Sequence, residues 1–208
     1  AIAQRREQRR EALEAAARRD WERVPIALPR LMMELREILA PGTVIFEEAV
    51  SASPFLRRYI PIREPGTLFR HRGGALGLGL PGALGVKLAL PQRPVVAVVA
   101  DGAALYVIQA LWTAAHHRIP VTFVICNNRS YRVLKLNMLE YLGEAALARP
   151  FIGLDLTDPE LDFARIAEAF GVPGWRVERP QEIAPALKEA LAREGPALVD
   201  VIVEGSVP

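Results

Sequence analysis

One apolar run, residues 94–100, does most to narrow the folds open to this chain. It contains no charged residue and no apolar/polar alternation, which is typical of a strand buried on both faces of a parallel sheet. A similar run at residues 121–126 predicts a second strand, and the largely apolar residues 197–203, interrupted by Asp200, predict a third. A short strand is expected at residues 43–46, and a further one at residues 175–177.

Segments with apolar residues at helical spacing lie between these strands. They cover residues 29–39, 104–117, 163–170 and 181–193. Strands that alternate with helices in this way predict βαβ units, and therefore a parallel sheet with helices on both faces. The predicted fold class is α/β.

The first 24 residues have a different composition from the rest of the chain. They are rich in Ala, Arg and Glu and read as an exposed helix or an interdomain linker. We therefore expect residues 1–24 to be a linker or N-terminal helix and residues 25–208 to form one α/β domain. A globular enzyme rarely begins this way, so the chain is expected to continue a longer protein.

Charge and composition indicate which partners to expect. The formal net charge is +2, and the N-terminal arginines are mixed with glutamates, so no nucleic acid partner is expected. No stretch reaches the roughly 18–20 apolar residues of a membrane span, so no membrane partner is expected either. The single cysteine, Cys126, lies in an apolar run and is interpreted as a buried residue. One cysteine without a disulfide partner suits the cytoplasm.

Polar residues follow two of the predicted strands. Asp101 comes directly after the strand at 94–100, and Asn128 and Ser130 come after the strand at 121–126. In a parallel sheet these strand ends can converge, and ligands bind beyond them. A carboxylate, an amide oxygen and a backbone carbonyl are hard ligands that suit Mg²⁺, which usually completes its shell with water and phosphates. Gly102 and a helix expected to start near residue 104 would then face a diphosphate.

A plainer interpretation stays open for each cluster taken alone. An Asp-Gly pair after a strand is often a turn with a helix cap, and an Asn-Asn pair is often turn chemistry. The joint pattern is less common by chance.

That joint pattern resembles the signature of thiamine-diphosphate-dependent enzymes. In this family the motif begins with Gly-Asp-Gly and ends with Asn-Asn, as residues 101–102 and 127–128 do here apart from the first glycine. The Gly-rich residues 73–85 resemble the family's Gly-rich helix start, and similarity extends over roughly residues 25–205. It is closest to the decarboxylase and acetolactate-synthase-like branch.

The resemblance implies a cofactor and roles for individual residues. Thiamine diphosphate would bind through Mg²⁺ held by Asp101, Asn128 and the carbonyl of Ser130. The Gly74 carbonyl would face the aminopyrimidine, and Leu76 would bend the cofactor into a V shape. The remaining implied residues would line the diphosphate: Ser51, Gly102, Ala103 and Tyr131. Leu134 and Leu136 would lie near the substrate.

The resemblance also implies a reaction and partners. The whole protein would be a 2-oxo acid decarboxylase or carboligase acting on a small 2-oxo acid, and homo-oligomeric. A glutamate on a separate pyrimidine-binding domain, in the same or another chain, would assist proton transfer; Glu47 and Glu48 are not that glutamate. Alone, this domain would be inactive. The alternative is a non-catalytic α/β module that binds a diphosphate or nucleotide.

Several positions depart from the family pattern. Ala100 replaces a glycine, Ala103 replaces a common serine, and Val50 stands where a hydroxyl residue is frequent. Each lost hydroxyl removes one possible hydrogen bond to phosphate, but the backbone N–H of residue 103 remains. His71 is a candidate acid–base group, although a structural role is the main expectation.

Overall fold

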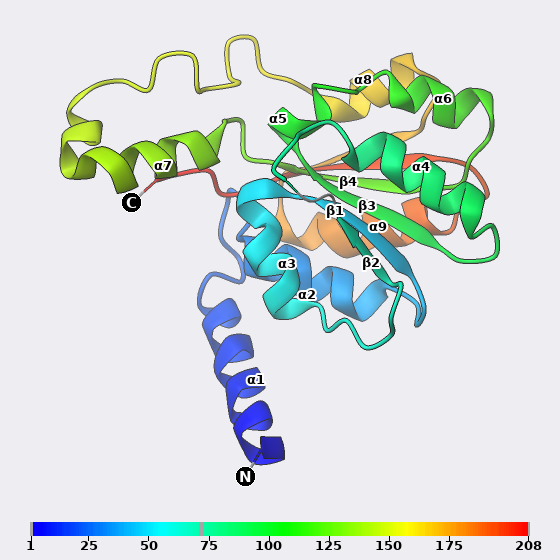
Figure 1. The fold of residues 1–208 in the computed structure, drawn as a ribbon, viewed down its shortest axis with the longest axis horizontal. Helices are drawn as coiled ribbons and strands as arrows, with labels where there is room; N and C mark the ends of the chain where they lie inside the picture. The colour runs from blue at the N-terminus through cyan, green and yellow to red at the C-terminus, as the bar shows by residue number, and fades with distance from the viewer. Residues whose placement is uncertain (1, 71–72, 208) are drawn as a thin grey trace.

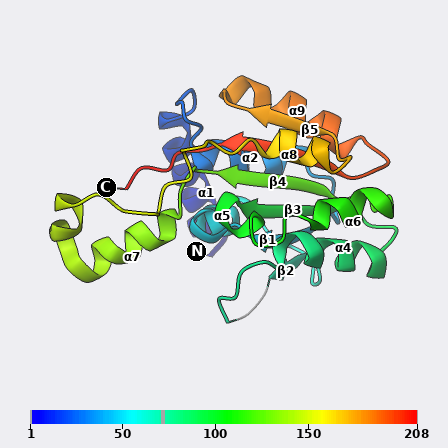
Figure 2. The same cartoon turned by 90° about the horizontal axis from the view of Figure 1, so that it is seen from above.

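The computed structural model describes residues 2–70 and 73–207. Within them, six strands form one sheet in the order β2-β1-β3-β4-β6-β5, and every neighbouring pair is parallel. The strands are β1 (Val44–Glu48), β2 (Leu68–Arg70), β3 (Val95–Ala100), β4 (Thr122–Asn127), β5 (Gly174–Val177) and β6 (Ala197–Ile202). Figure 2 shows them side by side from β2 to β5. The predicted α/β class with a parallel sheet is confirmed.

The central strands are buried on both faces, as their apolar runs predict. Every residue of β1, β3, β4 and β6 is buried. Because side chains alternate across a strand, Val96 and Val98 enter one apolar core while Val95, Ala97 and Val99 enter the other. The sheet therefore separates two cores, each closed by its own helices.

Two sets of helices cover the sheet (Figure 1). The first core takes its apolar side chains from α2 (Leu28–Ile38), α3 (Ser53–Tyr59) and α9 (Ile183–Leu191). The second takes them from α4 (Gly79–Ala89), α5 (Asp101–Ala104), α6 (Ala110–His116) and α8 (Phe163–Ala169). Short 3-10 turns are η1 (Val50–Ala52), η2 (Gly143–Ala148) and η3 (Pro180–Glu182).

Two helices lie away from the layered body. α1 (Ile2–Arg19) projects from it, and α7 (Arg132–Leu142) lies beyond the carboxyl ends of the strands beside the C-terminal tail (Figure 1). Among the described residues, no helix is long and apolar enough to cross a lipid bilayer.

Two expectations from the sequence were wrong in detail. The segment predicted as one helix at 104–117 is divided into α5 and α6, with turns at residues 105–109 between them. Glu47 and Glu48 do not follow β1 but form its last two residues, both buried. Both differences arise near the carboxyl ends of strands, where contacts with distant segments decide the local structure.

Candidate functional site

The strand order places a crevice between the ends of β1 and β3. From β1 the chain moves outward to β2, whereas β3 pairs on the other side of β1 and leads on to β4. In open parallel sheets, ligands bind where the strand order reverses in this way, beyond the carboxyl ends of the strands. The residues at this point are Val50 and Ser51 after β1, Asp101 after β3, and Asn128 to Ser130 after β4.

Asp101 is a buried carboxylate that faces the loop after β4. Its side chain is 1% exposed; Oδ1 accepts the N–H of Gly102 at 2.9 Å and Oδ2 accepts the N–H of Ser130 at 3.2 Å. Burial raises the pKa of Asp101 to about 6, although these backbone N–H groups oppose that rise. The structure thus joins the ends of β3 and β4 through this carboxylate.

Asn128 connects the same loop to the end of β1. Its Nδ2 donates to Oγ of Ser51 at 3.3 Å. Its Oδ1 is buried and has no hydrogen-bond partner among the described residues. A buried, unpaired amide oxygen is destabilising, and a hard cation would satisfy it. This oxygen is the observation that fits a metal ion best.

The backbone carbonyl of Ser130 lies on the same side of its chain segment as its N–H. Residues 130 and 155 form an antiparallel bridge, and the flanking bonds run from Tyr131 N–H to Leu154 and from Leu156 N–H to Arg129. Residue 130 is therefore in a non-hydrogen-bonded pair, so its own N–H and carbonyl point away from residue 155. The N–H reaches Asp101, and the carbonyl points to that side too.

Gly102 and Tyr131 are in close contact. A Cβ added at Gly102 would lie 2.6 Å from the Tyr131 ring, so the absence of a side chain at 102 lets the ring pack there. Ala103 is also buried in the four-residue helix α5. The expected long helix starting near residue 104 is absent from this part of the described chain, so its dipole does not support an anion there. The first N–H groups of the α5 turn still lack intrahelical partners.

A second part of the site is a cavity of about 490 Å³ beside the ends of β1 and β2. Val50, Gly74 and Leu76 line it, together with Glu47 and Glu48. The φ angle of Gly74 is +75°, which favours glycine, and Leu76 is 39% exposed. Gly74 and Leu76 therefore share one cavity, next to the Ser51 segment that contacts Asn128.

Glu48 anchors the Gly-rich loop, a role that the sequence reasoning missed. Its carboxylate accepts the N–H groups of Gly77, Leu78 and Gly79 at 3.0, 3.2 and 2.8 Å. These are the N–H groups that precede and begin α4, so the carboxylate caps this helix. An acidic residue at a strand end and a Gly-rich helix start were visible in the sequence, but not that they pair.

The backbone strain at Val50 and the position of Gly205 were not predicted from the sequence. Val50 has φ +49°, which is strained for a β-branched residue and costs on the order of 1–3 kcal/mol. Gly205, in the C-terminal tail, passes so close that an added Cβ would lie 2.4 Å from the Asn128 carbonyl oxygen. The strained residue Val50 directly precedes Ser51, and Gly205 packs against Asn128. Both features therefore act on the segments that carry these two site residues.

The two leucines that are expected to lie near the substrate are both on helix α7. Leu134 is 45% exposed and Leu136 is half-buried. Two cations on this helix are engaged within the chain: Lys135 pairs with Asp155, and Arg132 donates to the carbonyl of Ser206. His71 lies outside the described residues.

Comparison with known proteins gives this arrangement a context. The family described as thiamine pyrophosphate enzyme, C-terminal TPP binding domain, matches residues 49–201. A benzoylformate decarboxylase of Pseudomonas aeruginosa is 37% identical over 174 residues, which are 83% of this chain and 32% of that protein. A putative acetolactate synthase large subunit of Mycobacterium tuberculosis is 42% identical over 137 residues, which are 65% of this chain and 26% of that protein.

Solved structures give a similar result. A thiamine diphosphate-dependent 4-hydroxybenzoylformate decarboxylase of Rhodococcus jostii superposes with a TM-score of 0.79 and 32% identity, covering 87% of this chain and 33% of its own. Benzoylformate decarboxylase of Polynucleobacter necessarius gives a TM-score of 0.76 and 28% identity, covering 86% of this chain and 33% of its own. The chain spans about a third of the length of these relatives.

Proposed function

Because the chain belongs to the thiamine pyrophosphate enzyme family, as its C-terminal TPP-binding domain, we propose that it binds thiamine diphosphate through Mg²⁺. Asp101, Asn128 and the carbonyl of Ser130 are the proposed metal ligands. The single observation that carries this proposal is the buried, unpaired Oδ1 of Asn128 in a loop whose N–H groups contact Asp101. One carboxylate, one amide and one carbonyl leave positions for diphosphate oxygens and water, as Mg²⁺ usually requires.

Two groups of residues are proposed to contact different parts of the cofactor. The first group lies at the ends of β1, β3 and β4 and is proposed to contact the diphosphate: Ser51, Gly102, Ala103 and Tyr131. Gly74 and Leu76 line the neighbouring cavity and are proposed to contact the pyrimidine and bend the cofactor. Glu48 holds their loop in place through its three backbone contacts.

We propose that the whole protein is a decarboxylase or carboligase for a small 2-oxo acid. Support comes from the names of the relatives, benzoylformate decarboxylase and acetolactate synthase. Bound thiamine diphosphate supplies a nucleophilic carbon and an electron sink for such a substrate. The chain's own residues bind, orient and shield the cofactor.

A pyrimidine-binding domain is the proposed partner, in the same chain or another, within a homo-oligomer. The carboxylates that line the 490 Å³ cavity are already engaged, because Glu47 accepts from Ser53 and Glu48 from the Gly-rich loop. A proton-transfer glutamate is therefore expected from outside this domain. Exposed apolar side chains of α7 offer a surface for that domain: Leu134, Met138, Tyr141 and Leu142.

Calorimetry tests the proposed cofactor site directly. Titration of the natural protein with thiamine diphosphate in the presence of Mg²⁺ should show binding, and EDTA should abolish it, because the metal joins the diphosphate to Asp101 and Asn128. ADP titrated under the same conditions is the comparison for the alternative, a general diphosphate- or nucleotide-binding module. Unchanged binding in EDTA, or ADP displacing the cofactor at equal concentration, would contradict the proposal.

Gly205→Ala should weaken the metal site without touching a ligand. The new Cβ would lie 2.4 Å from the Asn128 carbonyl oxygen, so the tail and the Asn128 backbone can no longer keep their present separation, and we expect the Asn128 loop to shift. Groups that orient metal ligands typically contribute about ten- to a hundredfold in metal affinity, and we expect a loss of that size. The Mg²⁺ concentration required for cofactor binding measures it. Gly195→Ala is the matched control, since a Cβ there meets nothing within 4 Å; an equal loss in both variants would refute the role of Gly205.

A further inference from the structure

A larger cavity lies at the opposite end of the sheet from the proposed cofactor site. Its volume is about 920 Å³, within the range of roughly 300–1,000 Å³ typical of ligand pockets. Its walls come from α1, α2, the loop before β1, the end of α3 and the loop that follows α3. Residues 42–43, before β1, line this cavity, whereas Glu47 and Glu48 line the other. Ile45, the second residue of the five-residue strand β1, also lines this cavity, so the two cavities approach each other along β1.

The charge of the lining is unbalanced toward arginine. The basic lining residues are Arg10, Arg36, Arg57, Arg58 and Arg63, and the acidic ones are Glu14, Glu37 and Glu64. Arg36 is neutralised within the cavity, because it pairs with Glu14 at 3.1 Å and Glu37 at 2.7 Å. Glu64 is drawn toward Arg93, at 3.5 Å. Arg10 pairs with Glu7, just outside the lining, so the guanidinium groups of the lining that have no carboxylate partner among the described residues are Arg57, Arg58 and Arg63.

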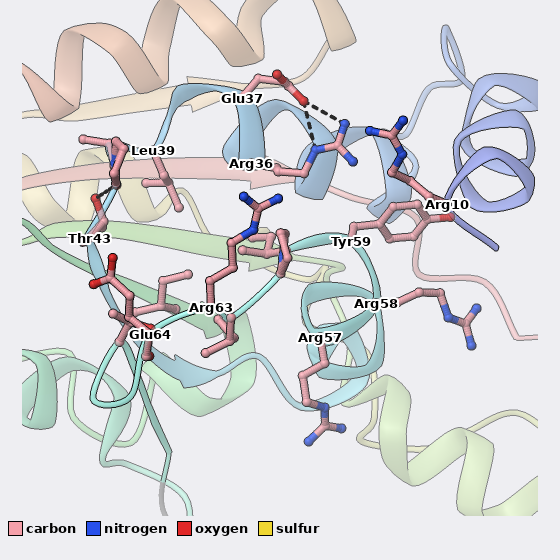
Figure 3. Close-up of a pocket in the computed structure, with 18 of the residues that line it drawn as sticks. Arg10, Arg36, Glu37, Leu39, Thr43, Arg57, Arg58, Tyr59, Arg63 and Glu64 are labelled. Carbon is pink, nitrogen blue, oxygen red and sulfur yellow. Dashed lines mark hydrogen bonds and ion pairs between the residues drawn. The ribbon is translucent and has the colours of Figure 1, made fainter. Parts of the chain in front are cut away.

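Arg63 is the inward-facing arginine of this cavity with the fewest hydrogen-bond and ion-pair partners. Among the described residues it has no hydrogen-bond or ion-pair partner, and the same holds for Arg57 and Arg58. Figure 3 shows Arg10, Arg36 and Arg63 extending toward the middle of the cavity from α1, α2 and the loop after α3. Arg57 and Arg58 extend outward from α3 in the same view. Of these three inward groups only Arg63 has no acidic partner, so its uncompensated charge favours an anion in the cavity.

Apolar side chains make up much of the remaining wall. Tyr59 is part of this wall, and its hydroxyl donates a hydrogen bond to the Leu13 carbonyl. The aliphatic residues of the wall are Leu13, Leu39, Ile45, Ile60 and Ile62. Simple inorganic anions gain nothing from such surface. A guanidinium fork matches the paired oxygens of a phosphate, and the apolar wall suits an aromatic or aliphatic group.

We propose that this cavity binds an organic phosphate with at least two negative charges and an apolar group, of the size of a nucleoside diphosphate. It would be a second ligand site, at the amino end of β1, whereas the proposed cofactor site lies at the carboxyl end. Arg63 would be its main phosphate contact, with Arg10 and Arg36 as neighbours. Arg57 lines both cavities, so it does not distinguish them.

Titration of the natural protein with ADP in EDTA tests the proposal, because the chelator removes the metal on which the cofactor site depends. We expect saturable ADP binding that weakens with added salt, weaker binding of pyrophosphate, and none of adenosine. Arg63→Gln should reduce ADP affinity about tenfold or more, since it removes a charge-assisted contact. Arg165→Gln is the control. This exposed arginine lies on α8, which packs on the face of the sheet opposite to α2 and α3.

The outcomes separate this cavity from the cofactor site. Asp101→Ala should leave ADP binding in EDTA unchanged, and Arg63→Gln should leave Mg²⁺-dependent thiamine diphosphate binding unchanged. The proposal is overturned if ADP does not bind in EDTA, if Arg63→Gln and Arg165→Gln behave alike, or if Asp101→Ala removes ADP binding. Equal affinity for pyrophosphate and ADP would overturn the claim that an apolar group is recognised. Arg63 is exposed, so circular dichroism should show that its variant is folded.

Discussion

Asp101→Asn should abolish Mg²⁺-dependent binding of thiamine diphosphate. Asparagine keeps the size of the side chain but removes the one carboxylate proposed to hold the metal. Charge-assisted contacts contribute about 1.5–3 kcal/mol each, so losing the charge toward a doubly charged ion should reduce affinity by about ten- to a hundredfold or more, below detection at working concentrations. Calorimetry at fixed Mg²⁺ measures the loss. Asp20→Asn, at the exposed end of the N-terminal helix, is the matched control.

A second variant distinguishes loss of a metal ligand from misfolding of the Asp101 variant. Asn128→Ala deletes the buried Oδ1 that has no partner among the described residues, at the expense of one long contact with Ser51. We expect its metal-free free energy of unfolding to change by less than about 1 kcal/mol, because an unsatisfied polar atom leaves with the lost hydrogen bond. Cofactor binding should nevertheless fall sharply. Full cofactor affinity in either folded variant would rule out the proposed metal site.

The parts of the fold that follow local periodicity could be predicted from the sequence. β3, β4 and β6 appear within a residue of their expected positions, because an apolar run buried on both faces needs no knowledge of its neighbours. β2, by contrast, is a three-residue edge strand that is largely exposed and has no distinctive pattern. The helix α4 contains Pro81, Gly82 and Gly85, which disfavour a helix locally, so only the resemblance indicated it.

The break between α5 and α6 shows how tertiary contacts override periodicity. Leu105, Ile108 and Leu111 have helical spacing, yet the N–H groups of residues 106 and 107 bond to carbonyls three residues back. A Cβ added at Gly77 would lie 3.1 Å from Val107 and 3.3 Å from Tyr106, so the Gly-rich loop packs directly on this segment. A contact between residues so far apart in the chain leaves no trace in local sequence.

The same distinction applies to the candidate site. Topology alone predicted that the ends of β3 and β4 converge, and Asp101 indeed accepts the N–H of Ser130. The supporting residues were not predictable, because each acts on a distant segment: Glu48 on residues 77–79 and Gly205 on Asn128. Strand ends can be located from patterns, whereas the groups that orient them require the folded chain.

Asp200 presents a different problem, a carboxylate buried in the middle of β6. Its side chain is 0% exposed; Oδ2 accepts the N–H of Phe163 at 3.1 Å, and Oδ1 has no partner among the described residues. Burial raises the pKa of Asp200 to about 7, although the neighbouring Asn127 side chain, the Phe163 N–H and the charge of Arg176 oppose the rise. In the unfolded chain the pKa of aspartate is about 3.9.

The raised pKa fixes the sign of a pH effect on stability. Below about pH 4 the carboxyl is protonated in both states, and between pH 4 and 7 only the folded state holds the proton. The contribution of Asp200 to stability is therefore present at low pH and is lost as the pH rises through 7. Linkage gives a loss of about 2–3 kcal/mol in the free energy of unfolding between pH 5 and pH 8.

Asp200→Asn should remove this dependence, because asparagine carries no charge to bury and its amide can still accept from Phe163. Urea unfolding at pH 5 and pH 8 measures it: the free energy of unfolding of the variant, relative to the unsubstituted protein, should rise by about 2–3 kcal/mol between the two values. Asp20→Asn, exposed and remote, should show no such relative change. Parallel pH profiles for Asp200→Asn and the unsubstituted protein would mean that Asp200 is already charged at pH 5, and that Asn127 and Arg176 outweigh its burial.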